Sequence, residues 1–240
     1  MKTLRHLITL ATALLMTMSA TAQEAAIRKA LEERIGKDFK VESVVPSPIS
    51  GLYEVRVGTD IFYVDDKAEN LIMGQIQNLK SGQNLTQDKL DKLASAAVFE
   101  ADNLKGALKQ VRGNGKRQVV LFEDLNCSYC KKLRAEMELL TDVTIYTYLI
   151  PILAADSATK LNNVWCASDR NKTYDDWMLR GVNPPAADSR CAATAPGEAN
   201  RTLASNLRVY GTPALFFESG KRVPGYINIA QLEENLSLPK

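Results

Sequence analysis

Apolar residues near the start of the chain change from a helical to a strand-like period. Ile27, Leu31 and Ile35 recur every four positions and predict one apolar stripe on a helix that ends at Gly36. Four short runs rich in β-branched and aromatic residues follow, over 41–45, 52–57, 60–64 and 70–79, with turn-forming residues between them. We therefore expect residues 23–82 to form a small domain of one helix and an antiparallel sheet.

The next stretch returns to a helical period. Six apolar residues recur every three or four positions, namely Leu90, Leu93, Ala97, Ala101, Leu104 and Leu108. This predicts a long amphipathic helix, or two helices joined near residues 103–106, so residues 83–114 are expected to be a helical linker. A unit of under about 60 residues buries little core of its own, so dimerisation of the N-terminal domain is plausible on physical grounds.

The last half of the chain begins with a strand, a helix and a second strand. They are predicted over residues 118–122, 127–140 and 144–150. Two strands joined by a helix imply a right-handed parallel βαβ unit. A mainly helical stretch over 155–207, a hairpin over 214–227 and a final helix over 230–236 follow. The expected fold class is α+β, with residues 115–240 as the larger domain.

The first 22 residues follow neither period. Lys2, Arg5 and His6 precede an almost uncharged apolar run, and the small residues 20–22 suit a signal peptidase. The run is short for a membrane span, although an uncleaved anchor is the alternative. We expect residues 1–22 to be a secretory signal peptide and the mature protein to lie outside the cytoplasm.

Removing this leader changes the charge and the available chemistry. The 30 basic residues lose Lys2 and Arg5, which leaves 28 beside 28 acidic residues. A net charge near zero argues against a nucleic-acid partner. The only histidine, His6, leaves with the leader, which excludes Ser-His and Cys-His dyads and histidine-ligated metals.

The motif Cys127-Ser128-Tyr129-Cys130 stands at the predicted start of a helix. Unpaired backbone N–H groups and the helix dipole stabilise a thiolate there, so Cys127 is expected to be the nucleophile. Cys130, one turn further on, can attack the resulting mixed disulfide and release the partner.

Two other interpretations of this pair are weaker. A zinc site would need Cys166 and Cys191 as well, and these do not form a second C-x-x-C. A static disulfide across two residues closes too small a loop to stabilise a fold. We therefore predict a redox pair, no metal and no cofactor.

Cys166 and Cys191 do not belong to a C-x-x-C motif, because neither has a cysteine three residues away. If joined, they close a loop of about 25 residues, worth ~3 kcal/mol on the chain-entropy estimate. A structural disulfide is favoured over a second redox centre.

Gly211-Thr212-Pro213 directly precedes the predicted strand over residues 214–217. A proline that opens a strand donates no hydrogen bond. The backbone of Thr212 is therefore expected to be free to pair with a peptide by strand addition.

Four segments together resemble the periplasmic disulfide isomerases of the DsbC and DsbG family, and DsbC more than DsbG. They are FEDLNCSYCKKL over 122–133, WCASDRNK over 165–172, GTPA over 211–214 and VPGY over 223–226. The N-terminal half is similar in layout. The resemblance implies a cystatin-like dimerisation domain, a linker helix and a thioredoxin-like domain with a helical insertion, assembled as a V-shaped homodimer.

The resemblance also implies roles for individual residues. It makes Cys127 the attacking thiolate and Cys130 the resolving thiol. Pro213 would be a cis-proline beside them, with Thr212 and Tyr129 contacting the substrate.

The same resemblance pairs Cys166 with Cys191 in a structural disulfide. It further implies a periplasmic isomerase and reductase of wrongly paired disulfides in exported proteins, kept reduced by the membrane reductase DsbD. A dithiol oxidase, a sulfenic-acid reductase of the DsbG type and a chaperone with secondary redox activity are the alternatives.

The sequence departs from the family at several positions near the cysteines. Ser128 replaces the usual glycine or proline, and Lys131 replaces a common histidine. Thioredoxin has a buried acid six residues before its first cysteine, where this chain has Leu121. No carboxylate proton relay is therefore assigned, and Asp124 is the nearest candidate.

Overall fold

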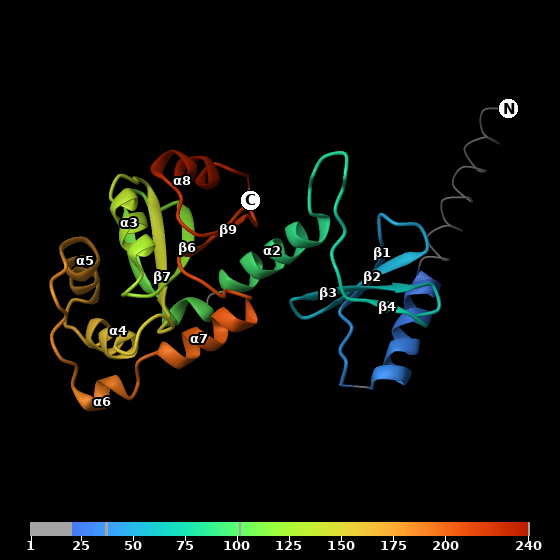
Figure 1. Ribbon diagram of the computed structural model, residues 1–240, viewed down its shortest axis with the longest axis horizontal. Coiled ribbons are helices and arrows are strands. Elements are labelled where there is room, and N and C mark those ends of the chain that lie inside the picture. Colours follow the sequence, from blue (N-terminus) through green and yellow to red (C-terminus); the bar gives the residue numbers. More distant parts are fainter. Residues whose placement is uncertain (1–20, 37, 101, 240) are drawn as a thin grey trace. The chain divides into compact units, whose positions relative to one another are not determined.

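The computed structural model describes residues 21–36, 38–100 and 102–239, so the predicted signal peptide lies outside the described residues except for Thr21 and Ala22. The chain divides into two compact units with the boundary between Leu90 and Asp91. This boundary falls inside helix α2, Leu85–Val98, and therefore inside the predicted linker (Figure 1).

The N-terminal unit contains a helix over residues 21–35 and an antiparallel sheet with strand order β1-β2-β3-β4. The strands are β1 Ser43–Pro46, β2 Leu52–Val57, β3 Asp60–Asp65 and β4 Leu71–Ile72. Ile27 and Leu31, on the predicted helix stripe, are buried in one cluster with Val55 and Phe62, which pair across β2 and β3. The helical and strand-like periods thus meet in one small core.

The fourth strand of this unit is shorter than predicted. Of residues 70–79, only Leu71 and Ile72 pair with β3, and an isolated bridge joins Gln77 to Asn84. Beyond the strand, the side chains of Met73 and Leu79 are 87% and 94% exposed. The apolar run therefore lies on the surface of this unit.

The C-terminal unit is built on a five-stranded sheet with strand order β5-β7-β6-β8-β9. Its strands are β5 Leu108–Arg112, β6 Arg117–Glu123, β7 Val143–Leu149, β8 Ala214–Phe217 and β9 Arg222–Pro224. Its helices are the short 3-10 helix η1 Asn103–Gly106, α3 Ser128–Met137, α4 Ser157–Trp165, α5 Arg170–Arg180, α6 Ser189–Ala192, α7 Gly197–Asn206 and α8 Ile229–Leu236. The predicted βαβ unit is present, because β6 and β7 are parallel and α3 connects them.

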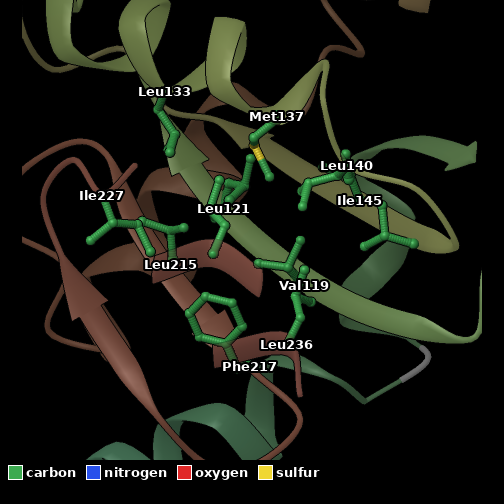
Figure 2. Close-up of a cluster of buried hydrophobic side chains, with 12 residues drawn as sticks. Val119, Leu121, Leu133, Met137, Leu140, Ile145, Leu215, Phe217, Ile227 and Leu236 are labelled. Carbon is green, nitrogen blue, oxygen red and sulfur yellow. The ribbon is translucent and has the colours of Figure 1, made fainter. Parts of the chain in front are cut away.

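Alternate residues of β6 bury both faces of this sheet. Val119 and Leu121 pack against Leu133 and Met137 of α3, in a cluster that α8 completes (Figure 2). Val120 and Phe122 point to the other face, where they join a cluster with residues of α2 and α7. Because both faces are covered, the centre of the sheet is dry and the end of β6 is held rigidly.

The predicted linker helix is wrong beyond Val98. Leu104 lies in η1, and Leu108 begins β5, which pairs antiparallel with β7 at the edge of the sheet. Leu104 and Leu108 are four residues apart, which is a helical spacing. Along β5, however, Leu108 is buried and Lys109 is exposed, as in a strand, because pairing with β7 determines the conformation.

The core around β6 predicts a large cost for cavity formation. Leu121→Ala should lower the free energy of unfolding of the C-terminal unit by about 3 kcal/mol, because its side chain is fully buried. Both tryptophans, Trp165 and Trp177, lie in this unit, so their fluorescence during urea unfolding measures the effect. The exposed Val111→Ala should change it by less than about 0.5 kcal/mol. Equal effects of the two changes would contradict this packing.

Candidate redox site at the start of helix α3

The cysteine pair lies between the end of β6 and the first turn of α3. A turn closed by the Cys127 N–H and the Asp124 carbonyl, at 2.9 Å, follows the strand. Cys127 is the N-cap residue of α3, with extended backbone angles of φ −76° and ψ 115°, and its sulfur accepts the backbone N–H of Cys130 at 3.2 Å. The Cys127 sulfur therefore takes the place that an N-capping oxygen usually fills.

The two thiols have opposite acidities. The pKa of Cys127 falls to about 6, because the Cys130 thiol hydrogen-bonds to it and Thr212 and backbone N–H groups of the first helical turn add to this stabilisation. The pKa of Cys130 is raised far above its ordinary value, first by burial and then by the same hydrogen bond to Cys127. At neutral pH, Cys127 is a thiolate and Cys130 a thiol.

A second loop lies against the reactive sulfur. The peptide bond between Thr212 and Pro213 is cis, and the Cys127 Sγ is 3.4 Å from the carbonyl oxygen of Thr212. The Pro213 carbonyl accepts the N–H of Gly225 at 2.7 Å, which ties this loop to the residue after β9. Tyr129, predicted to touch substrate, is 63% exposed. The structure thus brings Cys127, Cys130, Thr212 and Pro213 together.

Asp124, the acid that the sequence singled out, holds loops in place. Its Oδ2 accepts the N–H groups of Ile152 and Leu153 at 2.8 and 2.9 Å. Its Oδ1 accepts the N–H of Asn126 at 2.8 Å and the hydroxyl of Ser157 at 2.9 Å. Four hydrogen bonds occupy both oxygens, so this carboxylate fixes the two loops that follow β6 and β7.

The sequence reasoning missed Glu123, the last residue of β6. Its side chain is fully buried, and Tyr174 of α5 donates a hydrogen bond to its Oε2. Burial raises the pKa of Glu123 to about 7, against the lowering effects of the Tyr174 hydrogen bond and of Arg134. The sequence did hold one signal for this site, because Glu123 is a charged residue at the end of an otherwise apolar strand.

A tryptophan with two lysines covers the loop before the cysteines. The Trp177 indole N–H donates to the Leu125 carbonyl at 2.5 Å. The Nζ atoms of Lys131 and Lys160 lie 4.1 and 4.4 Å from the centre of the indole ring. Burial and the charge of Lys160 lower the pKa of Lys131. These contacts hold Lys131 beside the indole, so it is not simply a solvated residue.

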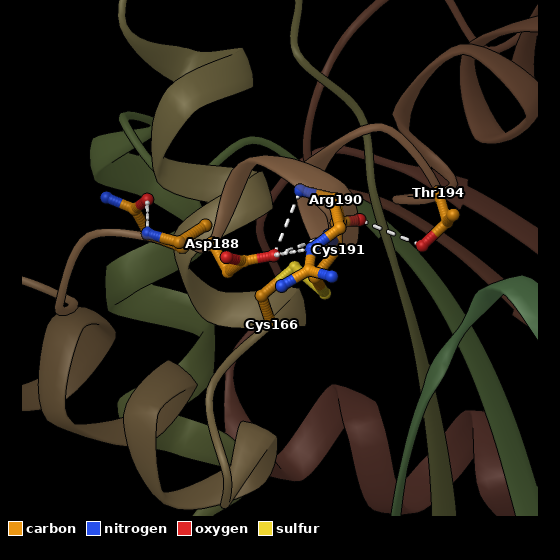
Figure 3. Close-up of a disulfide and its surroundings, with 7 residues drawn as sticks. Cys166, Asp188, Arg190, Cys191 and Thr194 are labelled. Carbon is orange, nitrogen blue, oxygen red and sulfur yellow. Dashed lines mark hydrogen bonds and ion pairs between the residues drawn. A yellow bond between two sulfur atoms is a disulfide. The ribbon is translucent and has the colours of Figure 1, made fainter.

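Cys166 and Cys191 are joined by a disulfide (Figure 3). It links the C-terminal end of α4 to α6, across a sequence separation of 25 residues. The Asp188 side chain caps α6 by accepting the N–H groups of Arg190 and Cys191. The bridge closes the helical insertion and lies on other elements than the Cys127–Cys130 pair.

A low-pKa thiolate at a helix start, a buried second thiol and an adjacent cis-proline define a thioredoxin-like thiol–disulfide oxidoreductase. Comparison with known families agrees with this class. Residues 18–87 match the disulfide bond isomerase protein N-terminal domain, and residues 104–238 match a thioredoxin-like domain. The chain belongs to the DsbC family of thiol:disulfide interchange proteins, whose disulfide isomerase and oxidoreductase function it shares.

Individual relatives support the same placement. The probable thiol:disulfide interchange protein DsbC of Bordetella pertussis is 40% identical over 214 residues, which cover 89% of this chain and 74% of that protein. The DsbC of Escherichia coli is 28% identical over 90% of this chain and 89% of its own length. A solved disulfide interchange protein from Neisseria gonorrhoeae is 39% identical, with a TM-score of 0.50, over 55% of this chain and 94% of that one. The predicted α+β class and the family resemblance are confirmed.

Within residues 21–239, apart from 37 and 101, no cluster of three or more histidine, cysteine or acidic side chains could ligate a metal ion. In the same part of the chain, no helix has the length and apolar character needed to cross a membrane.

The hydrogen bonds to Cys127 predict how its thiolate titrates. Thiolate absorbance should rise with a midpoint near pH 6, because both Cys130 and the helix backbone stabilise the charged form. Cys130→Ser keeps a side-chain donor and should leave the midpoint nearly unchanged. Cys130→Ala removes the donor and should raise the midpoint. A midpoint close to about 8.5 in all three proteins would contradict the geometry.

Proposed function

We propose that this protein rearranges wrongly paired disulfides through Cys127, with Cys130 as the resolving thiol. The observation that carries the assignment is that the Cys127 sulfur accepts hydrogen bonds from the Cys130 thiol and from the Cys130 N–H, which lower the pKa of Cys127, whereas burial raises that of Cys130. Cys127 attacks a substrate disulfide, a mixed disulfide forms, and one substrate sulfur leaves as a thiolate.

The mixed disulfide then has two outcomes. In isomerisation, another thiolate of the substrate attacks its own sulfur in the mixed disulfide, and Cys127 is released as a thiolate. In reduction, Cys130 attacks Cys127 and the substrate leaves with both sulfurs reduced. Because burial keeps Cys130 protonated, its attack is slow to begin, which gives the substrate time to rearrange.

The substrate contacts proposed for the cis-proline loop rest on its position. Thr212 is partly exposed and its carbonyl lies 3.4 Å from the Cys127 sulfur, so an extended peptide bonded to Cys127 passes alongside this loop. Tyr129 is exposed in the first turn of α3 and supplies an apolar surface for the same peptide.

We further propose that the protein is periplasmic, that residues 1–22 are removed on export, and that its substrates are misfolded disulfide-containing exported proteins. The leader composition supports export, and four cysteines suit an oxidising compartment. Isomerisation requires a reduced pair, so an electron donor such as the membrane reductase DsbD is required as a partner.

A homodimer through the N-terminal unit is supported by its edge strand. Leu71 and Ile72 of β4 are 44% and 47% exposed, and the neighbouring Met73 and Leu79 are exposed further. Exposed apolar residues at a sheet edge favour pairing with a second copy of the same strand. The family match of this unit supports the same partner.

The isomerase assignment predicts recovery of a small enzyme whose disulfides have been scrambled. In a mildly reducing glutathione buffer, residues 23–240 should reactivate it, and Cys127→Ala should abolish the recovery because no nucleophile remains. Cys130→Ala should keep part of it, since rearrangement needs only the first thiolate. Scrambled enzyme that stays inactive while reduced enzyme is rapidly oxidised would identify an oxidase instead.

A chaperone function is tested by the same preparation. The Cys127→Ala, Cys130→Ala double variant should lose all disulfide exchange. If it also loses the ability to suppress aggregation of an unfolded protein, the chaperone alternative is rejected.

The edge-strand argument predicts the oligomeric state. Light scattering of residues 23–240 should give a dimer, and Ile72→Lys should give a monomer at micromolar concentration because it places a charge at the paired edge. Leu139→Lys changes an equally apolar residue that is 66% exposed in the C-terminal unit, and it should leave the dimer intact. A monomeric parent protein would contradict the homodimer, and a dimeric Ile72→Lys would exclude this edge.

A further inference from the structure

Glu123 is a carboxyl group enclosed in the same interior as the resolving cysteine. Its Oε2 accepts the Tyr174 hydroxyl, whereas its buried Oε1 has no hydrogen-bond partner among the residues that the structure describes. The Tyr174 ring packs in one apolar cluster with Cys127 and Cys130. A buried carboxylate oxygen without a donor is costly, unless it takes up a proton.

Charged and titratable groups face this carboxyl from two helices. From α3 they are Arg134 and the two cysteines, and from α5 they are Tyr174 and Asp175. Arg134 is 2% exposed, and its guanidinium is held by Asp175 through hydrogen bonds of 2.9 and 2.7 Å. Arg134 also pairs with Glu138 at 2.7 Å, so its charge is shared between two carboxylates and lowers the pKa of Glu123 less than an unpaired arginine would.

We propose that Glu123 accepts the proton of Cys130 when the mixed disulfide is resolved, and that Tyr174 positions its carboxylate for this step. The proposal rests on the assignment of Cys127 as the nucleophile and Cys130 as the resolving thiol. Glu123 lies four residues before Cys127, at the end of β6, and not at the position of Leu121.

In this step the Cys130 S–H bond breaks and its proton passes to the Glu123 carboxylate. The Cys130 sulfur forms a bond to the Cys127 sulfur, the bond from Cys127 to the substrate sulfur breaks, and its electron pair leaves with the substrate thiolate. The cysteine pair is oxidised and the substrate sulfur is reduced. When the pair is reduced again, Glu123 returns the proton to Cys130 and takes up another from solvent as the Cys127 thiolate forms.

The electrostatic coupling between Cys127 and Glu123 determines at which stage of the reaction the proton is transferred. In the reduced protein, the negative charge of the Cys127 thiolate raises the pKa of Glu123, which favours a protonated carboxyl. Once Cys127 is bound in a mixed disulfide, that charge is gone and the pKa of Glu123 falls. The carboxyl group then releases its proton to solvent and can accept the proton that Cys130 must lose.

A two-phase reaction separates this role from nucleophilic attack. Reduced protein (residues 23–240) is mixed with excess dithiobis(nitrobenzoate), and each phase releases one coloured thiolate. The first phase depends on the reagent concentration and reports attack by Cys127. The second is independent of it and reports attack by Cys130. In the parent protein, the second rate should rise with pH, bend at or below about pH 7, and then level off.

Glu123→Gln keeps the size of the side chain and the hydrogen bond from Tyr174, but it cannot accept a proton. Its second phase should slow by about 100-fold at neutral pH and rise about tenfold per pH unit without a bend. Its first phase should stay within about threefold of the parent rate. Glu136→Gln is the matched control, since Glu136 belongs to α3 and also accepts a tyrosine hydroxyl, that of Tyr226 at 2.8 Å. It should leave both phases unchanged.

Tyr174→Phe is a second test that does not depend on the folding of Glu123→Gln. Loss of the hydroxyl removes the hydrogen bond that lowers the pKa of Glu123, so the bend in the second phase should move to higher pH. A bend that stays in place in Tyr174→Phe, or a parent-like pH profile in Glu123→Gln, would overturn the proposal. A missing first phase would instead overturn the assignment of Cys127.

Discussion

The sulfur of Cys127 caps the first turn of α3, and this hydrogen bond needs the end of β6 and the start of α3 to be fixed together. Both faces of β6 are buried, so the strand cannot shift without opening a core. Asp124 then binds the loops after β6 and β7 with four hydrogen bonds. The cis-proline loop closes the third side, with the Thr212 carbonyl against the sulfur. Together these elements hold the sulfur against the Cys130 thiol and the N–H groups of the first helical turn, which stabilise its thiolate.

The same arrangement places the two sulfurs in different electrostatic surroundings. Cys127 lies at the open end of the helix, where the dipole and N–H groups favour negative charge. Cys130 and Glu123 lie one layer deeper, where burial disfavours any charge. When a proton moves from Cys130 to Glu123, the two groups together carry one negative charge before and after the transfer, so the step adds no charge to the interior. The reactivity of Cys127 and the storage of a proton on Glu123 both follow from one helix start.

Much of this was predictable from sequence because the signals are local. The C-x-x-C motif and the apolar run over residues 118–122 each lie within a few residues, and both predicted the correct element. Glu123 was missed because its partner Tyr174 lies 51 residues away and only the folded chain brings them together. The strand at Leu108 was missed for the same reason, since pairing with β7 overrides a helical spacing. The periodicity of apolar residues along the sequence does not predict which distant segments come into contact.

The central claim is that one of the two thiols alone is reactive at neutral pH. Brief treatment of the reduced protein with a limiting amount of iodoacetamide at pH 7, followed by mass spectrometry of its peptides, tests this directly. The account predicts that the label is found on Cys127 and is nearly absent from Cys130, because only Cys127 is a thiolate. Comparable labelling of both residues, or earlier labelling of Cys130, would contradict it.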